Sequence, residues 1–261
     1  MKELSRQPVT PDKIAFLFDV DNTLLDNDRV SADLGKFLER EGGAKRARGY
    51  WKIFEQLRAR LGYADYLGAL QGYRSAYPED PGILTASRYL LQYPFADRLF
   101  PGALEVIAHV RQWAPATLLS DGDVVFQPHK VERSGLYDAV NGCVLIYAHK
   151  ELQLEDVARR VPAGHYVVVD DKLRLLAAIK KIWGRRVTTV FVRQGHYAHD
   201  PKILATYPAA DITIECLGNL LDHDWANFAN ETNAAPGRVR VKQTWKVPRR
   251  AVSQAPAHEP S

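Results

Sequence analysis

The sequence predicts an α/β protein with a doubly wound, Rossmann-like parallel sheet and a helical cap domain. Two observations predict this fold class. Short apolar runs alternate with segments of helical periodicity through most of the chain, which is typical of right-handed βαβ units and a parallel sheet. Residues 24–99 interrupt this alternation with helical segments alone. A helical block of that length between two strands is an insertion, and we expect it to form a small domain.

Six apolar runs are the candidate strands. The first ends in an acid and is apolar enough for a parallel strand that is buried on both faces. The runs are residues 13–19, 116–119, 143–147, 166–169, 187–192 and 211–214. Helical segments at 102–113, 151–160 and 172–183 lie between several of these runs, and the last segment ends at Gly184, a common helix stop.

The insertion and the tail complete the predicted organisation. Four helices are expected in the insertion, at 30–41, 46–61, 63–76 and 83–92, with breaks at Gly42-Gly43, Gly62 and the turn 78–82. The predicted domains are a core of residues 1–23 and 100–230, a cap of residues 24–99 and a tail of residues 231–261. The tail contains four prolines and little apolar sequence, so we expect it to be disordered or loosely docked.

The charge of the chain is concentrated in that tail. The formal net charge is +4, and residues 231–261 contain six Lys or Arg against two Asp or Glu. The remaining chain carries 29 basic and 29 acidic residues, so we expect no nucleic-acid partner except through the tail. The apolar runs are too short to span a bilayer, so no membrane partner is expected. The chain starts without an apolar run, and we interpret its two cysteines, Cys143 and Cys216, as buried thiols. Both observations predict a cytoplasmic protein.

Polar residues follow four of the predicted strands, and the ligands of open α/β sheets bind at this edge. They are Asp19 to Thr23 after the first strand, Ser120 to Asp123 after the second, Lys150 after the third, and Asp170-Asp171 after the fourth. Clustered carboxylates repel one another unless a cation lies among them, and hard oxygen ligands suit Mg²⁺. An aspartate beside such a metal can attack phosphorus, and a second carboxylate can protonate the leaving oxygen. These residues are a complete set for phosphoryl transfer.

The same residues resemble the four motifs of the haloacid dehalogenase-like (HAD) hydrolases. Asp19-Val20-Asp21-Asn22-Thr23 after an apolar strand is similar to the first motif, and Ser120 to the hydroxyl residue of the second. Lys150 is similar to the lysine of the third motif, and Asp170-Asp171 to the acidic pair of the fourth. The resemblance covers roughly residues 13–220 and implies a HAD core, with residues 24–99 in the place where members of this type carry a cap.

The resemblance also implies a role for each residue. Asp19 would be the nucleophile and a metal ligand, and Asp21 the general acid and base, with its backbone carbonyl facing the metal. Ser120 and Lys150 would bind the phosphoryl oxygens, together with Asp121 and Gly122. The implied Mg²⁺ ligands are Asp19, Asp21, Asp171 and Asp170.

Asp21 distinguishes between two branches of the family. Dehalogenating members lack an acid two residues after the nucleophile, because a halide leaves without a proton. An alkoxide leaving group needs one, so the resemblance implies hydrolysis of a small phosphomonoester through an aspartyl-phosphate on Asp19. A phosphomutase or other phosphotransferase, and a non-catalytic binding protein that uses its cap or tail, remain as alternatives. An apolar cap surface could also support a dimer.

Several residues have a second interpretation. Lys130 competes with Lys150 for the third-motif role, and we prefer Lys150 because it follows a strand, whereas Lys130 is expected on a helix facing solvent. Asp121 and Asp123 are expected in a turn, where Asp121 would lend only its backbone N–H to phosphate. The histidines show no metal-ligand spacing, so we expect surface positions for them: His109, His129, His165, His196 and His199. A metal site from His196, His199 and Asp200 is not expected.

Overall fold

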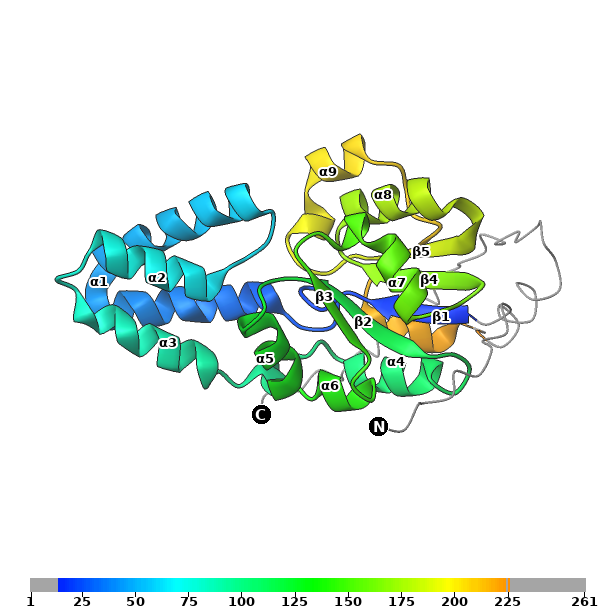
Figure 1. Ribbon diagram of the computed structural model, residues 1–261, viewed down its shortest axis with the longest axis horizontal. Helices are drawn as coiled ribbons and strands as arrows, with labels where there is room; N and C mark the ends of the chain where they lie inside the picture. Colours follow the sequence, from blue (N-terminus) through cyan, green and yellow to red (C-terminus); the bar gives the residue numbers. More distant parts are fainter. Residues whose placement is uncertain (1–13, 224, 226–261) are drawn as a thin grey trace, which may run out of the picture.

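A six-stranded, all-parallel sheet lies at the centre of the larger lobe of the computed structural model, which describes residues 14–223 and 225 (Figure 1). The strand order is β3-β2-β1-β4-β5-β6. The strands are β1 (Ile14–Phe18), β2 (Ala116–Asp121), β3 (Val144–Tyr147), β4 (His165–Asp170), β5 (Val187–Val192) and β6 (Ile212–Ile214). Each predicted apolar run overlaps one strand, and the predicted doubly wound fold class is confirmed.

The side chains of β1 alternate between two hydrophobic cores, as the two-residue period of a strand requires. Phe16 and Phe18 pack on one face of the sheet and Ala15 and Leu17 on the other. The first face is covered by α4 (Ala103–Val110), α5 (Phe126–Arg133) and α6 (Leu136–Ala139). The second is covered by α7 (Leu154–Arg160), α8 (Leu173–Trp183) and α9 (Pro201–Thr206) (Figure 1). Because both faces are covered, the central strands are apolar throughout.

The strand order reverses at β1. The chain leaves β1 toward β2 and β3 on one side and returns to β4, β5 and β6 on the other. The carboxyl ends of β2, β1 and β4 are therefore neighbours at the point where ligands of doubly wound sheets bind.

Between β1 and β2 the chain forms a smaller lobe of helices (Figure 1). They are α1 (Asn27–Leu61), α2 (Tyr66–Ala76) and α3 (Leu84–Leu91). Asp26 caps α1 by accepting a hydrogen bond of 2.8 Å from the N–H of Arg29. The break predicted at Gly42-Gly43 is present, because Gly43 has a φ of 74° and a ψ of 171°, a conformation open to glycine. The two arms of α1 fold back on each other there. We refer to this helical lobe, residues 27–91, as the cap.

Other predictions differ in detail or lie outside the described residues. The helix expected over 63–76 begins at Tyr66, because Asp65 caps it. Cys143 and Cys216 are exposed, so the prediction of buried thiols is wrong; both lie at strand ends, beyond the covered part of the sheet. The tail 231–261 lies outside the described residues, so its predicted disorder stays a prediction.

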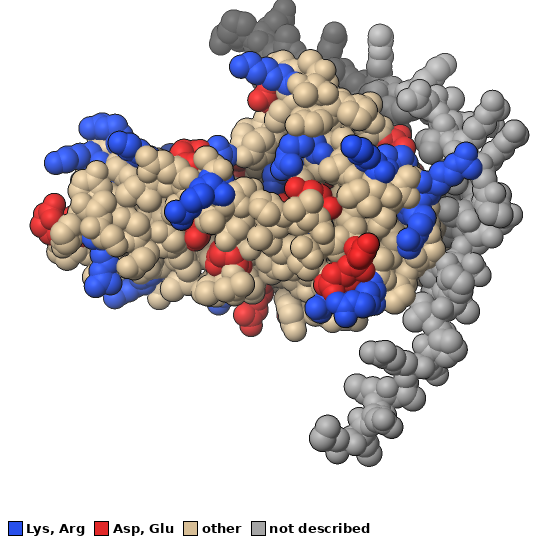
Figure 2. All heavy atoms as spheres, turned by 45° about the horizontal axis from the view of Figure 1, so that its top comes forward, with Lys and Arg blue, Asp and Glu red and all other residues tan. Residues whose placement is uncertain are grey.

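The described surface carries both signs of charge. Figure 2 shows Lys and Arg side chains interspersed with Asp and Glu over one face. This agrees with the balanced charge of the chain before residue 231. Among the described residues no helix is long and apolar enough to cross a membrane.

Candidate active site

The carboxylate of Asp19 lies at the carboxyl end of β1, between the ends of β2 and β4. It is 2 % exposed. Its Oδ1 lies 2.5 Å from the Nζ of Lys150, and its Oδ2 accepts a hydrogen bond of 3.3 Å from the hydroxyl of Thr23. The Thr23 oxygen also accepts from the N–H of Asp171 at 3.1 Å, so one hydroxyl links two of the predicted site residues. Thr23 belongs to the first motif, but the sequence alone predicts no role for it.

Lys150 reaches this site from the segment after β3 and is 1 % exposed. Its Nζ lies 2.7 Å from Asp170 Oδ2 as well as beside Asp19, and it donates to the carbonyl of Leu119 at 3.1 Å. Burial alone would lower the pKa of Lys150, but the charges of Asp170 and Asp19 outweigh burial and raise it. Lys150 is therefore a fixed ammonium against Asp19, and its third-motif role stays a prediction.

Three buried carboxylates meet in one small volume. Ligand oxygens of Asp19, Asp170 and Asp171 all lie within 4.8 Å of one another. Neither carboxylate oxygen of Asp171 has a hydrogen-bond partner among the described residues. Burial raises the pKa of Asp171 well above its usual value, and the charges of Asp170 and Asp19 add to this, with Lys172 opposing them. A buried carboxylate without a partner is costly, and oxygen ligands at this spacing fit a divalent cation.

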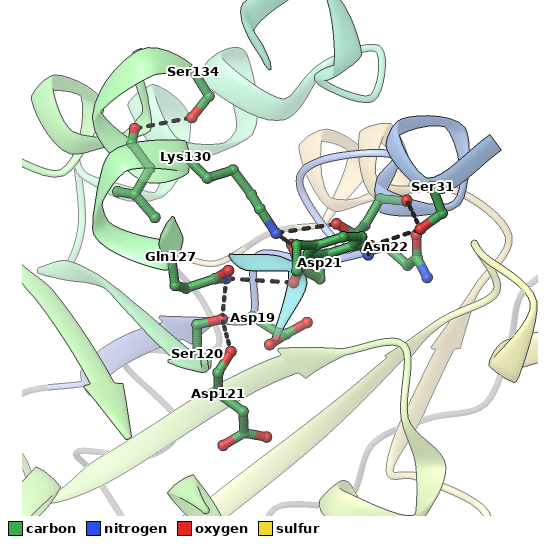
Figure 3. A network of polar contacts seen from close by, with 12 residues as sticks. Asp19, Asp21, Asn22, Ser31, Ser120, Asp121, Gln127, Lys130 and Ser134 are labelled. Atoms are coloured by element: carbon green, nitrogen blue, oxygen red, sulfur yellow. Dashed lines mark hydrogen bonds and ion pairs between the residues drawn. The ribbon is translucent and has the colours of Figure 1, made fainter. Parts of the chain in front are cut away.

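The carboxylate of Asp21 is not part of that group. Its Oδ1 lies 2.7 Å from the Nζ of Lys130 (Figure 3). The same Nζ donates to Asn27 Oδ1 at 3.0 Å. Lys130 is 1 % exposed, so the prediction that it faces solvent is wrong. The helix α5 packs under the cap, and the rings of Tyr66 and Phe126 lie 5.9 and 5.6 Å from the ammonium.

Ser120 and the glycine after β2 form the adjoining side of the site. The Ser120 hydroxyl accepts a hydrogen bond of 2.9 Å from Nε2 of Gln127, a residue of α5 that the sequence analysis missed (Figure 3). A Cβ on Gly122 would lie 2.7 Å from Gln127 Cβ, so glycine is what permits this close approach. The N–H of Gly122 donates to the carbonyl of Tyr147 at 2.9 Å and is used within the fold.

Asp121 also uses its side chain within the fold. Its Oδ1 accepts a hydrogen bond of 2.7 Å from the N–H of Lys150. Burial raises the pKa of Asp121, against the opposing charge of Lys150. Asp121 therefore orients the segment that carries Lys150, while the contact of its backbone N–H to phosphate stays a prediction.

A cavity of about 360 Å³ opens beside these residues, between the end of α1 and the core. Asp121 and Lys172 line it together with Arg58 of α1 and Tyr197 of the core. The guanidinium of Arg58 donates to the hydroxyl of Tyr197, which joins the two lobes across the cavity. Lys172 was missed in the sequence, although it directly follows Asp170-Asp171. Burial would lower its pKa, but Asp19 and Asp171 raise it, so Lys172 adds a second fixed cation to the site.

The histidines are only partly where we expected them. His196 and His199 are exposed, and His196 Nδ1 lies 2.7 Å from Asp28 Oδ1 at the start of the cap. His165 is 9 % exposed, so its predicted surface position is wrong. It begins β4 in the middle of the sheet, and its Nε2 lies 2.9 Å from Thr188 Oγ1 on β5. Among the described residues, the one group with metal-ligand spacing is Asp19, Asp170 and Asp171.

Known proteins are similar to this chain in sequence and in fold. The model of the haloacid dehalogenase-like hydrolase family matches residues 15–183. A crystal structure of a haloacid dehalogenase-like hydrolase from Burkholderia xenovorans LB400 is 58 % identical, covers 83 % of this chain and 98 % of its own, and superposes with a TM-score of 0.80. The magnesium-bound HAD-hydrolase YfnB from Bacillus subtilis is 17 % identical, covers 80 % and 97 %, and gives 0.55. L-2-haloacid dehalogenase from Xanthobacter autotrophicus, with chloropropionic acid covalently bound, is 15 % identical, covers 80 % and 96 %, and gives 0.53. A search of curated protein sequences found no match.

Proposed function

Because the chain belongs to the haloacid dehalogenase-like hydrolases, we propose that it hydrolyses a small phosphomonoester with Mg²⁺ as cofactor and Asp19 as nucleophile. One observation carries this proposal. A second carboxylate, Asp21, follows two residues after Asp19, which itself belongs to a buried group of three carboxylates. Hydrolysis of an ester needs both a nucleophile and an acid for the leaving oxygen, and dehalogenation needs only the first.

The residues that would hold the metal are Asp19, Asp170 and Asp171. The two Asp171 oxygens, which receive no hydrogen bond among the described residues, support this assignment most directly. Bound there, Mg²⁺ would neutralise charge on the phosphoryl oxygens. The Bacillus subtilis hydrolase, which shares this fold, is bound to magnesium, and this is consistent with the choice of metal.

The first chemical step would be attack of Asp19 on phosphorus. Lys150 offsets the charge of the Asp19 carboxylate, and the contacts from Lys150 and Thr23 fix its orientation. Ser120, Lys150 and Lys172 supply a hydroxyl and two ammonium groups for the phosphoryl oxygens. The cavity of about 360 Å³ beside them suits a small leaving group.

Asp21 would transfer the proton in both steps. It protonates the leaving oxygen while the bond from Asp19 to phosphorus forms, and then takes a proton from the water that hydrolyses the aspartyl-phosphate. The cap, which Arg58 joins to Tyr197 of the core, would limit the access of water to the site. The localisation that we expect for this activity is cytoplasmic, and the partner is a small phosphorylated molecule.

The test is phosphate release from a panel of phosphomonoesters, with Mg²⁺ or with a chelator, by wild type and Asp19→Asn. We expect release that needs Mg²⁺ and falls by at least about 10³-fold in the variant, since the nucleophile is lost. Asp211→Asn is the control, because Asp211 pairs with Lys180 on the far side of the core.

Two parallel assays separate the alternatives. Chloride release from 2-chloropropionate by wild type, without phosphate release from any ester, would contradict the proposal and indicate a dehalogenase. Transfer of phosphate to an added alcohol in place of water would identify a phosphotransferase.

A further inference from the structure

Lys130 has no part in the reaction described so far, yet its ammonium is buried against Asp21 (Figure 3). We propose that Lys130 is a positioning residue, which holds the Asp21 carboxylate for proton transfer and ties it to the cap. This inference rests on the proposed function of the site.

The two oxygens of Asp21 have different surroundings. Oδ1 lies 2.7 Å from Lys130 Nζ. Oδ2 lies 3.4 Å from Gln127 Nε2, and the same amide donates to Ser120 Oγ at 2.9 Å. Because Ser120 is the proposed phosphoryl-binding hydroxyl, anchoring Oδ1 at Lys130 leaves Oδ2 directed toward the phosphoryl group. The long contact to Gln127 leaves that oxygen available to the leaving group.

A second set of contacts joins Lys130 to the cap. Its Nζ donates to Asn27 Oδ1 at 3.0 Å, and Asn27 Nδ2 donates to the hydroxyl of Tyr66 at 3.1 Å. The Tyr66 hydroxyl lies 2.6 Å from Ser31 Oγ. Asn27 begins α1 and Tyr66 begins α2, so the path from Asp21 reaches the first residues of two cap helices.

Stability alone does not account for a lysine at this position. Replacing a buried ion pair with well-packed apolar side chains is often neutral or stabilising. The Lys130 ammonium already lies 5.9 and 5.6 Å from the rings of Tyr66 and Phe126, so a methionine at this position would also have aromatic neighbours. What the ammonium adds is a fixed position for Asp21, and a displacement of about 1 Å in a reacting group can cost about 10²-fold in rate.

The proton steps define what must be positioned. Asp21 Oδ2 gives its proton to the leaving oxygen as the phosphorus–oxygen bond of the ester breaks and the bond from Asp19 forms. It regains a proton from water as the water oxygen bonds to phosphorus and the bond to Asp19 breaks. Lys130 takes no part in either proton transfer.

The leaving group gives a readout that a purely structural lysine would not change. A good leaving group such as p-nitrophenolate needs little protonation, whereas an alkoxide needs it fully. We would measure kcat/KM, which reports the steps up to formation of the aspartyl-phosphate, for a series from p-nitrophenyl phosphate to alkyl phosphates. The variants are Lys130→Met, Lys130→Arg and Asp21→Asn, with Lys180→Met as the matched control that loses an ion pair far from the site.

For Lys130→Met we expect about a 10²-fold loss of kcat/KM with alkyl phosphates and less than about 3-fold with p-nitrophenyl phosphate. Asp21→Asn should show the same trend more steeply, Lys130→Arg should recover part of the loss, and Lys180→Met should match wild type. If Lys130→Met does not fold, Asn27→Ala removes the second anchor instead, and we expect the same trend at about 10-fold.

The remaining outcomes distinguish failure of the positioning role of Lys130 from failure of the proposed function. An equal loss for every leaving group in the Lys130 and Asn27 variants, with the expected trend in Asp21→Asn, would overturn the positioning role and leave the proposed function in place. A uniform loss in Asp21→Asn, or no hydrolysis by wild type of any ester in the panel, would overturn the proposed function and this inference together.

Discussion

Replacing Asp171 with asparagine should stabilise the metal-free protein. Both oxygens of this side chain are buried, and neither receives a hydrogen bond among the described residues. Asp170 and Asp19 lie in the same group of carboxylates, so the charge of Asp171 is repelled as well as desolvated. Asparagine keeps the shape of the side chain and removes the charge.

The size of the effect follows from the cost of a buried charge without hydrogen-bond donors, about 1–3 kcal/mol, which an amide relieves because it is neutral and can donate to the neighbouring carboxylates. In a chain of 261 residues, 1 kcal/mol shifts Tm by about 2–4 °C, so we expect Asp171→Asn to raise Tm by about 2–12 °C in chelator. In Mg²⁺ the stability difference should change in favour of wild type. At a concentration of 100 times its Kd, Mg²⁺ stabilises wild type by about 2.7 kcal/mol, and the variant should lose most of that gain.

The assay is thermal unfolding of both proteins, in chelator and in a Mg²⁺ titration. Asp211→Asn is the control, because Asp211 accepts hydrogen bonds from Lys180 and from Thr189, and its loss should destabilise the protein under both conditions. The reasoning is refuted if Asp171→Asn lowers Tm in chelator, or if Mg²⁺ stabilises the variant as much as wild type.

Three further predictions concern other parts of the fold. Lys150→Met should lower the free energy of unfolding by about 3–5 kcal/mol, since two buried carboxylates lose their ammonium. A loss below about 1 kcal/mol in urea unfolding would contradict a stabilising role of these ion pairs. Burial lowers the pKa of His165 from 6.5 to about 4, so the unfolded chain binds the proton first and stability falls as pH drops from 6.5 to 4, by up to about 3 kcal/mol. Urea unfolding at pH 7.5 and 4.5 should show this loss in wild type but not in His165→Asn, and equal pH dependence in the two would count against it. Gly122→Ala should cost about 1–3 kcal/mol, because the new methyl group meets Gln127; unchanged urea stability would show that Gln127 can move away.

Most of the fold could be predicted from local patterns. Buried parallel strands such as β1 are continuous apolar runs, and glycines mark the break in α1 and the end of α8. The position of the cap followed from where the alternation of strands and helices stops. The boundaries were less accurate, because a single capping side chain such as Asp65 decides where a helix begins.

The site could be predicted only in part. Asp19, Lys150, Asp170 and Asp171 follow strands, and the sheet topology alone brings strand ends together. Lys130 could not be placed in the same way, because its environment depends on how α5 packs under the cap. A helical lysine is solvent-exposed unless a distant carboxylate compensates its charge, and no local signal marks that carboxylate.

The reversal of α1 at Gly43 has a consequence for how the two lobes can separate. The first arm leaves the core at Asn27, and the second returns to it, where Arg58 binds Tyr197 and the ring of His149 packs against Gly62. The covalent connections lie at the other end, where Leu25 bridges Leu99. The cap can therefore rotate about these connections once the contacts of Arg58 and Gly62, at the end of the second arm, are broken. The charge-assisted hydrogen bond from Arg58 is worth about 1.5–3 kcal/mol, so its loss should raise the population of an open state by about 10- to 150-fold.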